Sequence, residues 1–305
     1  MKPKIVIVLG PTAIGKSELA LELAQNIDGE IVNADSQQVY RCLDIGTGKP
    51  STEERLQVPH HLIDVVDPDE EFNAAQFRRM ALKIIEEIQG RKKTVIVCGG
   101  TGLYLKALTQ GLFDGPGQDA ALRAALERQI ESEGLPTLYQ RLVAIDGSVI
   151  STIHPNDRQR IIRALEVFEA TGRPLSAWQN EHAFRDQPFA ILKLGLLRER
   201  AELYDRINHR SEQMVRDGLL EEVEGLVARG YSLDLKALRS VGYRQMGEVL
   251  RGEKDLTGAL EEMKQETRRL AKRQLTWFRR DREIEWFHPD KQRQEIFRRA
   301  KEFLR

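Results

Sequence analysis

The sequence predicts an α/β fold, with a P-loop-type doubly wound parallel sheet as the core and a helical insertion domain within it. Three observations lead to this prediction. Short apolar segments alternate with helical patterns up to about residue 110. A Gly/Pro-rich stretch follows at residues 111–117, and then only helical patterns occur to about residue 180. Strand character returns at residues 190–197. We therefore expect the α/β core at residues 1–114 and 190–305, and the helical insertion at residues 115–189.

The first expected strand, residues 4–9, is short and β-branched, as is typical of a central parallel strand that is buried on both faces. Further strands are expected at residues 30–34, 61–66, 94–98 and 190–197. A helix follows residue 17, and another lies between Asn73 and Gly90. For that second helix, Asn73 and Gln76 predict a capping box, and Phe72 and Phe77 a hydrophobic staple. After residue 197 only helices are expected, the longest at about residues 256–280.

The composition argues against a disordered or a membrane-spanning protein and leaves binding of a polyanion open. The chain has 305 residues, of which 41% are hydrophobic and 31% charged, which indicates a globular protein rather than a disordered one. No apolar run approaches the roughly 18 residues of a membrane span, and no signal peptide is apparent. Two cysteines, Cys42 and Cys98, suit the reducing cytoplasm. The formal net charge is zero, but residues 264–305 hold 14 Lys/Arg and 7 Asp/Glu, and such a basic segment can bind a polyanion.

Residues 10–17 match the P-loop pattern G-x-x-x-x-G-K-[ST], between a buried strand and an amphipathic helix. The backbone N–H groups of such a loop enclose a di- or triphosphate at a helix N-terminus. The lysine reaches the phosphate oxygens, and the final hydroxyl binds Mg²⁺. The predicted phosphate-binding residues are Gly10, Pro11, Thr12, Ala13, Ile14, Gly15, Lys16 and Ser17, with Ser17 as the metal ligand.

Other polar residues allow more than one interpretation. The strand at 94–98 ends in a glycine turn, residues 99–102, instead of the acidic residue that an ATPase or GTPase needs for Mg²⁺. Asp35, just past the second strand, fits a metal ligand, a general base or a helix cap. Arg210 fits a phosphate clamp or a solvated charge. The basic run at residues 268–282, next to Trp277, fits nucleic-acid contact or a solvated helix face.

Taken together, these motifs resemble one family, the bacterial type of tRNA dimethylallyltransferase, also called tRNA isopentenyltransferase. The P-loop alone is unspecific, but the ordered set of segments is highly specific. The resembling segments lie at residues 10–17, 33–41, 44–50, 60–67, 99–105, 154–174, 240–245 and 272–279.

The resemblance implies transfer of a dimethylallyl group from dimethylallyl diphosphate to N6 of the adenosine on the 3′ side of the anticodon, in tRNAs reading codons that begin with U. It also implies Mg²⁺ as cofactor and the tRNA anticodon stem-loop as partner; we expect a monomer with no membrane association. By motif, the catalytic residues are Asp35, Thr101 and Arg210. The implied tRNA contacts are Asp35, Ser36, Gln37, Gln38, Thr101, Arg123, Gln159, Arg160, Ile161, Ile162, Arg163, Ser240, Val241, Gly242, Tyr243, Arg244 and Gln245.

Three alternatives compete with this assignment. A P-loop small-molecule kinase needs ATP affinity and a pocket for a phosphate acceptor. The related adenylate isopentenyltransferase acts on free AMP, whereas the helical insertion and the basic C-terminal segment favour a polynucleotide. An RNA-binding module that only senses a nucleotide has no use for Asp35 beside a phosphate loop.

Overall fold

The computed structural model describes residues 2–112, 115–182 and 186–305. The chain divides into two compact units, which are described separately. The core unit comprises Met1–Thr109 with Gln187–Arg305, and the helical unit comprises Gln110–Asp186. The boundary expected at residue 114 lies outside the described residues.

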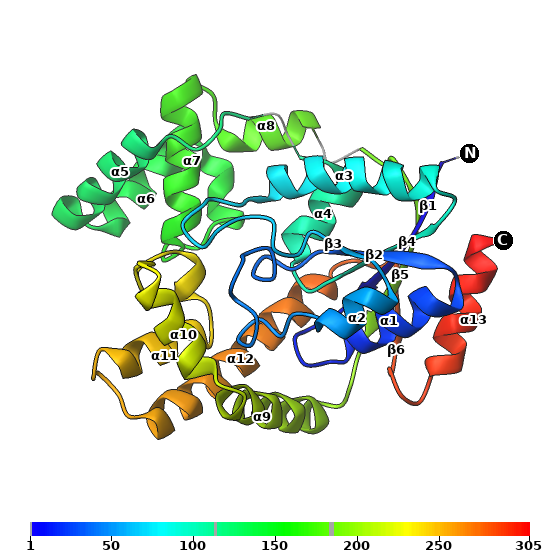
Figure 1. Cartoon of the computed structure of the whole chain (residues 1–305). Helices are drawn as coiled ribbons and strands as arrows, with labels where there is room; N and C mark the ends of the chain where they lie inside the picture. Colours follow the sequence, from blue (N-terminus) through cyan, green and yellow to red (C-terminus); the bar gives the residue numbers. More distant parts are fainter. Residues whose placement is uncertain (1, 113–114, 183–185) are drawn as a thin grey trace. The chain divides into compact units, whose positions relative to one another are not determined.

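A six-stranded parallel sheet forms the centre of the core unit (Figure 1). The strand order is β3-β2-β4-β1-β5-β6, so β1 lies between β4 and β5. The register pairs Ile5 with Val95 on one side and with Ile191 on the other. The predicted α/β fold is confirmed. The strands are β1 (Lys4–Leu9), β2 (Gly29–Asn33), β3 (His60–His61), β4 (Thr94–Gly99), β5 (Ala190–Leu196) and β6 (Ile284–Phe287).

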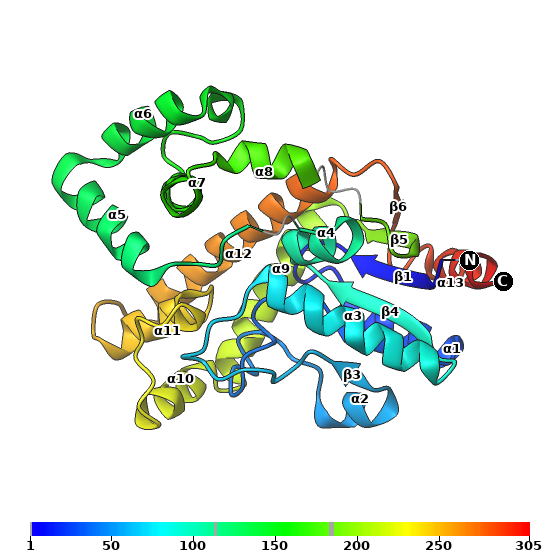
Figure 2. The ribbon, with the colours of Figure 1, turned by 90° about the horizontal axis from the view of Figure 1, so that it is seen from above.

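Alternate residues of β1 enter two different hydrophobic cores. Ile5 and Ile7 belong to a core shared with α3 (Ala74–Gly90) and α4 (Gly102–Gln110). Val6 and Val8 belong to a core shared with α1 (Lys16–Asn26) and α13 (Arg293–Leu304). Figure 2 shows α3 alongside β4, and α13 beside the end of the sheet that β5 and β6 form. Both faces of β1 are therefore buried, which explains its apolar sequence.

The predicted start of α3 is confirmed. Asn73 Oδ1 accepts hydrogen bonds from the N–H groups of Ala75 and Gln76, both at 3.0 Å. Gln76 Oε1 accepts one from the Asn73 N–H at 2.9 Å, which completes the capping box. Phe72 and Phe77 are both buried, and their ring centroids lie 6.2 Å and 4.5 Å from that of Tyr104. These contacts fix α3 against α4.

Two strand predictions were wrong. The strand expected at residues 61–66 is only His60–His61, because Leu62 and Asp64 adopt positive φ (61° and 56°), which ends the extended conformation. Strand β6 was missed, since only helices were expected after residue 197. It pairs in parallel with β5, with Lys193 opposite Ile284. Its four residues, IEWF, are too few to give a strand pattern in the sequence.

The remaining helices of the core unit are α2, before β3, and a group after β5 that is coloured yellow-green to orange in Figure 1. The helix expected at residues 256–280 is confirmed as α12. These elements are α2 (Thr52–Gln57), α9 (Arg200–Arg216), α10 (Leu219–Ala228), the 3₁₀ helix Ala237–Arg239, α11 (Tyr243–Leu250) and α12 (Leu256–Phe278).

The helical unit has its own core, formed by residues such as Leu126, Leu142 and Leu165. Its described residues contain helices and no strand. None of the helices in the described parts of the chain is both long and apolar enough to cross a membrane. The helices of this unit are α5 (Ala120–Glu133), α6 (Leu135–Ile145), the 3₁₀ helix Gly147–Ser151, α7 (Arg158–Thr171) and α8 (Leu175–His182).

Candidate active site

A cavity of about 710 Å³ lies at the carboxyl edge of the sheet. The phosphate loop after β1 and the segment after β2 line it, and Arg206 and Arg210 of α9 complete the wall. Open α/β sheets bind ligands outside the carboxyl ends of their strands, so the position is the expected one. The structure thus brings Lys16, Asp35 and Arg210 into one cavity, although they are far apart in the sequence.

Side chains from the C-terminal part of the core unit hold the phosphate loop. Arg206 Nε donates to the Ala13 carbonyl at 3.0 Å, and Arg198 Nε donates to the Ile14 carbonyl at 3.1 Å. Gln274 Oε1 accepts from the Thr12 N–H at 2.9 Å. These bonds fix the loop backbone before α1 begins, so the N-terminus of α1 is pre-organised to face an anion.

Two partly buried cations, Lys16 and Arg210, line the cavity. Lys16 Nζ donates to the Pro11 carbonyl at 2.7 Å. Burial lowers the pKa of Lys16 to about 8, against the opposing influence of Cys98 and Asp35. Burial also lowers the pKa of Arg210, while the nearby Asp35 carboxylate acts in the opposite direction. Desolvation thus disfavours both charges in the ligand-free protein, and a polyanion such as a diphosphate would relieve that cost.

Asp35 closes a backbone turn and also lies in the wall of the cavity. Its Oδ1 accepts from the N–H groups of Gln37 at 2.8 Å and Gln38 at 3.4 Å, which closes a turn. No helix begins at this point in the described part of the chain, so the helix-cap interpretation is wrong. Among the described residues both bonds go to Oδ1, which leaves Oδ2 to a ligand in the cavity. The turn contacts and a role as general base are therefore compatible.

Thr101 connects the segment after β2 to the turn after β4. Its Oγ1 accepts from the Ser36 N–H at 3.0 Å, and its own N–H donates to the Ala34 carbonyl at 3.3 Å. Thr101 therefore fixes the backbone on both sides of Asp35 relative to β4.

The predicted tRNA-contacting residues of the core unit differ in exposure. Gln38 is buried and donates from Nε2 to the carbonyls of Thr47 at 3.2 Å and Gly48 at 3.1 Å.

Tyr243 and Gln245 have no exposed surface, so their side chains cannot touch RNA in this structure. Val241 packs against the core, and Gly242 donates its N–H to Gln245 Oε1 at 2.8 Å. Ser240 and Arg244 keep some exposure, but Arg244 pairs with Glu248 and Glu262 at 2.9 Å and 2.7 Å.

In the helical unit, Gln159 and Arg160 are exposed at the start of α7, whereas Ile161 and Ile162 are buried in its core. The buried carboxylate of Glu166 pairs with Arg123 at 3.2 Å and with Arg163 at 2.9 Å. The sequence analysis did not identify Glu166. Direct tRNA contact by Gln159, Arg160, Arg123 and Arg163 stays a prediction.

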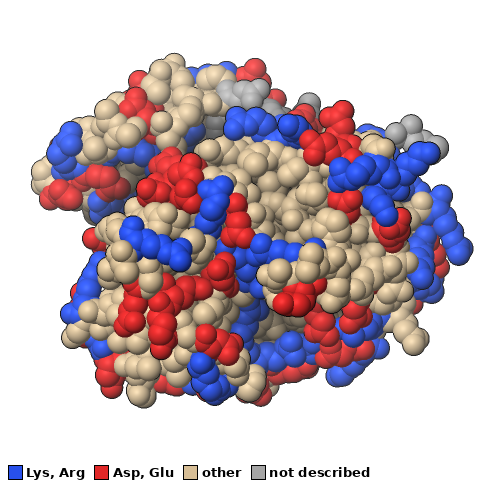
Figure 3. Space-filling model, in the orientation of Figure 1, with Lys and Arg blue, Asp and Glu red and all other residues tan. Residues whose placement is uncertain are grey.

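The basic run of α12 is partly paired within the protein. Arg268 donates to Asn208 Oδ1 at 2.7 Å and lies 5.9 Å from the ring centroid of Tyr204. Arg269 pairs with Glu266 at 2.5 Å. On the face shown in Figure 3, Lys and Arg side chains are interspersed with Asp and Glu. The sequence run of basic residues therefore overstates the free positive charge of α12, since Arg268 and Arg269 have partners within the protein.

The protein offers few oxygen ligands for a magnesium ion, and these suit an ion that is bound mainly by the phosphates of a substrate. Ser17 lies at the cavity, in the first turn of α1, with Asp35 in the wall of the same cavity. No cluster of three or more His, Cys, Asp or Glu in the described residues is arranged to bind a metal ion. Mg²⁺ commonly keeps several waters and binds one or two protein groups plus substrate phosphates, so these few ligands fit it.

Sequence reasoning missed the side chains that hold the loops. Arg198 is almost fully buried, and its guanidinium forms a bidentate pair with Asp290 at 2.5 Å and 2.9 Å. Glu222 binds the backbone of residues 44–46. Gln274 lies within the resembling segment at residues 272–279, which was a usable signal. Arg198 and Glu222 belong to no motif, and the loop segments that they hold, around Ile14 and residues 44–46, lie far away along the chain.

Known proteins resemble this chain over nearly its full length. The family model described as IPP transferase matches residues 38–281. The tRNA dimethylallyltransferase of Geobacter metallireducens is 56% identical over 285 residues, which cover 93% of this chain and 92% of the relative. The tRNA dimethylallyltransferase 2 of Syntrophus aciditrophicus is 50% identical over 304 residues, or 100% and 97% of the two chains.

Solved structures agree. The full-length tRNA isopentenylpyrophosphate transferase of Bacillus halodurans has a TM-score of 0.74 at 39% identity, covering 99% of this chain and 97% of that one. A eukaryotic dimethylallyltransferase, solved acting on tRNA, has a TM-score of 0.74 at 31% identity over 90% of this chain and 70% of its own. Because the fold, the phosphate loop and these relatives agree, the chain belongs to the IPP transferase family.

Proposed function

We propose that this protein transfers the dimethylallyl group of dimethylallyl diphosphate to N6 of the adenosine 3′-adjacent to the anticodon of tRNAs reading codons that begin with U, in the cytoplasm and as a monomer. The observation that carries the proposal is that one cavity brings together the phosphate loop, two partly buried cations and the Asp35 carboxylate. Family membership supports the choice of donor and of tRNA as acceptor. The two reduced cysteines suit the cytoplasm.

The residues of the cavity would act on the departing diphosphate of the donor and on the adenine amine of the acceptor. The C–O bond of the donor breaks, and negative charge develops on the departing diphosphate. Lys16, Arg210 and the N–H groups of the phosphate loop stabilise that charge. We propose the Ser17 hydroxyl as the protein ligand of Mg²⁺, which would supply further positive charge at the diphosphate.

Asp35 acts on the acceptor. The adenine must leave its stack to reach a donor beside the phosphate loop. Its exocyclic amine is a weak nucleophile because the lone pair is delocalised into the ring. A carboxylate within roughly 2.6–3.2 Å of that amine accepts its proton as the N–C bond forms. Gln37, Gln38 and Thr101 hold the Asp35 segment in place for this step.

The direct test incubates the protein with Mg²⁺, labelled dimethylallyl diphosphate and total tRNA, and locates the label by mass. Parallel reactions contain AMP as acceptor, or ATP as donor with small-molecule acceptors. Label on the adenosine next to the anticodon is the expected result. Label on AMP alone would identify an adenylate isopentenyltransferase, and ATP turnover without prenyl transfer would identify a kinase.

The charge assignment has its own test. Lys16→Ala and Arg210→Ala should raise the donor KM or lower kcat without changing tRNA affinity, because both cations are assigned to the diphosphate. Loss of tRNA binding with intact donor binding would contradict this assignment.

A further inference from the structure

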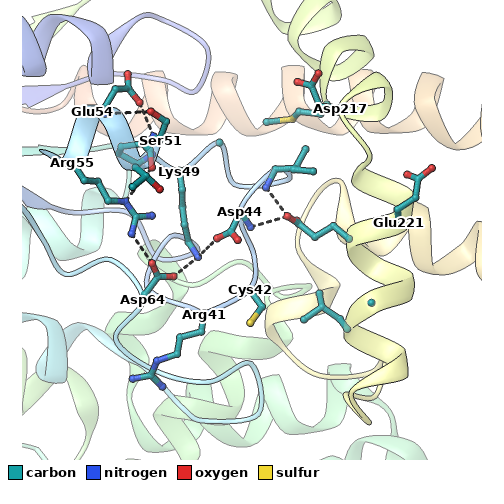
Figure 4. A pocket seen from close by; sticks show the side chains of 18 of the residues that line it. Arg41, Cys42, Asp44, Lys49, Ser51, Glu54, Arg55, Asp64, Asp217 and Glu221 are labelled. Atoms are coloured by element: carbon teal, nitrogen blue, oxygen red, sulfur yellow. Dashed lines mark hydrogen bonds and ion pairs between the residues drawn. The ribbon is translucent and has the colours of Figure 1, made fainter. Parts of the chain in front are cut away.

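The loop at residues 44–48 borders both the catalytic cavity and an adjoining second cavity of about 1070 Å³, shown in Figure 4. Its backbone contacts two side chains that line the catalytic cavity. The Thr47 carbonyl accepts from Arg210 Nη2 at 3.5 Å and from Gln38 Nε2 at 3.2 Å. The position of this loop therefore helps to determine where the Arg210 guanidinium lies.

Gly48 shows how close this contact is. It has φ of 59°, and a Cβ atom at this position would lie 1.9 Å from Arg210 Nη2. Only glycine leaves room for the guanidinium in this arrangement. The hydrogen bond between Arg210 Nη2 and the Thr47 carbonyl is already long at 3.5 Å, so a displacement of the loop would break this bond or move Arg210.

Glu222 of α10 holds the other side of the loop. Its carboxylate accepts from the N–H groups of Asp44 at 3.1 Å, Ile45 at 2.7 Å and Gly46 at 3.3 Å. It accepts a fourth hydrogen bond from the Tyr243 hydroxyl at 2.5 Å. A carboxylate is the appropriate group here, because it offers only acceptors to four donors.

Tyr243 is buried against the same loop. A Cβ atom on Gly46 would lie 2.4 Å from Tyr243 Cε2, so the ring packs directly on the loop backbone. Burial, together with the adjacent Glu222 carboxylate, raises the pKa of Tyr243, so its hydroxyl stays protonated and donates. Lys49 holds the far end of the loop, donating to the Tyr40 carbonyl at 2.6 Å and to Asp64 at 2.5 Å (Figure 4).

We propose that Glu222, together with Tyr243, is a positioning residue that sets the location of Arg210 through the loop at residues 44–48. The inference rests on the proposed role of Arg210 at the diphosphate. It gives Tyr243 a role through protein contacts, in place of the tRNA contact that the motif implied. Neither residue touches substrate in this scheme.

The test compares Glu222→Gln and Tyr243→Phe with Glu224→Gln, an exposed residue of the same helix. Glutamine presents an NH₂ donor to a site that contains only donors, whereas phenylalanine keeps the ring and removes one hydrogen bond. We expect the donor KM to rise about tenfold in Glu222→Gln and by a smaller factor in Tyr243→Phe. The tRNA dissociation constant and all parameters of Glu224→Gln should be unchanged. If Glu222→Gln does not fold, as judged by thermal unfolding, Tyr243→Phe alone decides.

An unchanged donor KM in both variants would overturn the proposal, as would weaker tRNA binding with normal donor kinetics. The double variant Glu222→Gln/Arg210→Ala should be no worse for the donor than Arg210→Ala, because Glu222 acts through Arg210. Additive effects would show an independent action and also overturn the proposal.

If Arg210→Ala itself leaves donor kinetics normal, the proposed function of Arg210 fails. A defect in Arg210→Ala with none in Glu222→Gln refutes the positioning role only.

Discussion

The desolvated ammonium of Lys16 should destabilise the ligand-free enzyme, and Lys16→Met tests this directly. The substitution removes the charge and keeps an unbranched side chain of similar length. Lys16 serves ligand binding in the proposed mechanism, so the ligand-free fold gains nothing from its charge. We expect the variant to unfold at a higher temperature than the natural protein and to lose its donor binding.

The magnitude follows from the pKa. Burial lowers the Lys16 pKa from 10.5 to about 8, and each pKa unit corresponds to about 1.4 kcal/mol, so folding the charged form costs about 3 kcal/mol. Loss of the hydrogen bond to the Pro11 carbonyl offsets about 1 kcal/mol of this gain. The expected net gain at pH 7 is about 2 kcal/mol, or about 3 °C in Tm for a chain of this length.

The sign depends on pH in a defined way. The folded-state pKa lies below the unfolded value, so the penalty is complete below about pH 8 and disappears as the pH rises toward 10.5, where the amine is neutral in both states. Urea and thermal unfolding at pH 7 and pH 10 measure the difference. Lys83→Met, at a lysine with 79% of its side chain exposed, serves as the control and should change stability by less than about 0.5 kcal/mol. A Lys16→Met variant less stable than the natural protein at pH 7, or a gain of equal size at both pH values, would refute the reasoning.

Two further predictions concern the reaction and the tRNA. Asp35→Asn keeps the shape and a hydrogen bond but cannot take a proton, so kcat should fall by about 10² to 10⁴ while both substrates still bind; near-normal turnover would leave Asp35 only with the turn that its contacts with residues 37 and 38 form. Replacing Arg268, Arg269, Lys272 and Arg273 with Ala should flatten the log–log salt dependence of tRNA binding, by about one unit for each phosphate that these side chains neutralise. An unchanged slope would identify these four side chains as a solvated helix face.

The parts of the fold that the sequence predicts are those with strong local signals. Strand β1 and the start of α3 are examples, because burial on both faces and a capping box each leave a pattern within a few residues. Strand β6 is different, since its four residues form a strand only through pairing with β5, about 90 residues earlier. The short β3 reflects left-handed backbone at Leu62 and Asp64, two non-glycine residues whose sequence gives no sign of that conformation.

The same distinction applies to the site. The phosphate loop and Asp35 were predictable, because a motif marks the first and the carboxyl edge of the sheet places the second. Glu222 was not predictable, since its acceptor role appears only when α10 meets a loop about 180 residues earlier in the chain. For Tyr243 the motif pointed to tRNA, whereas its complete burial requires a role through protein contacts.

The phosphate loop depends on the chain that follows the helical unit. Its backbone is bound by Arg198, Arg206 and Gln274, all of which lie after residue 187. Arg198 can be buried there because Asp290, in the segment between β6 and α13, neutralises its charge. Strand β5, which pairs with β1, also belongs to the segment after the helical unit. A chain ending before β5 would thus keep the P-loop sequence but lack these three side chains that fix its backbone. The motif alone is therefore not the binding site; the returning C-terminal segment gives the loop the geometry that an anion needs.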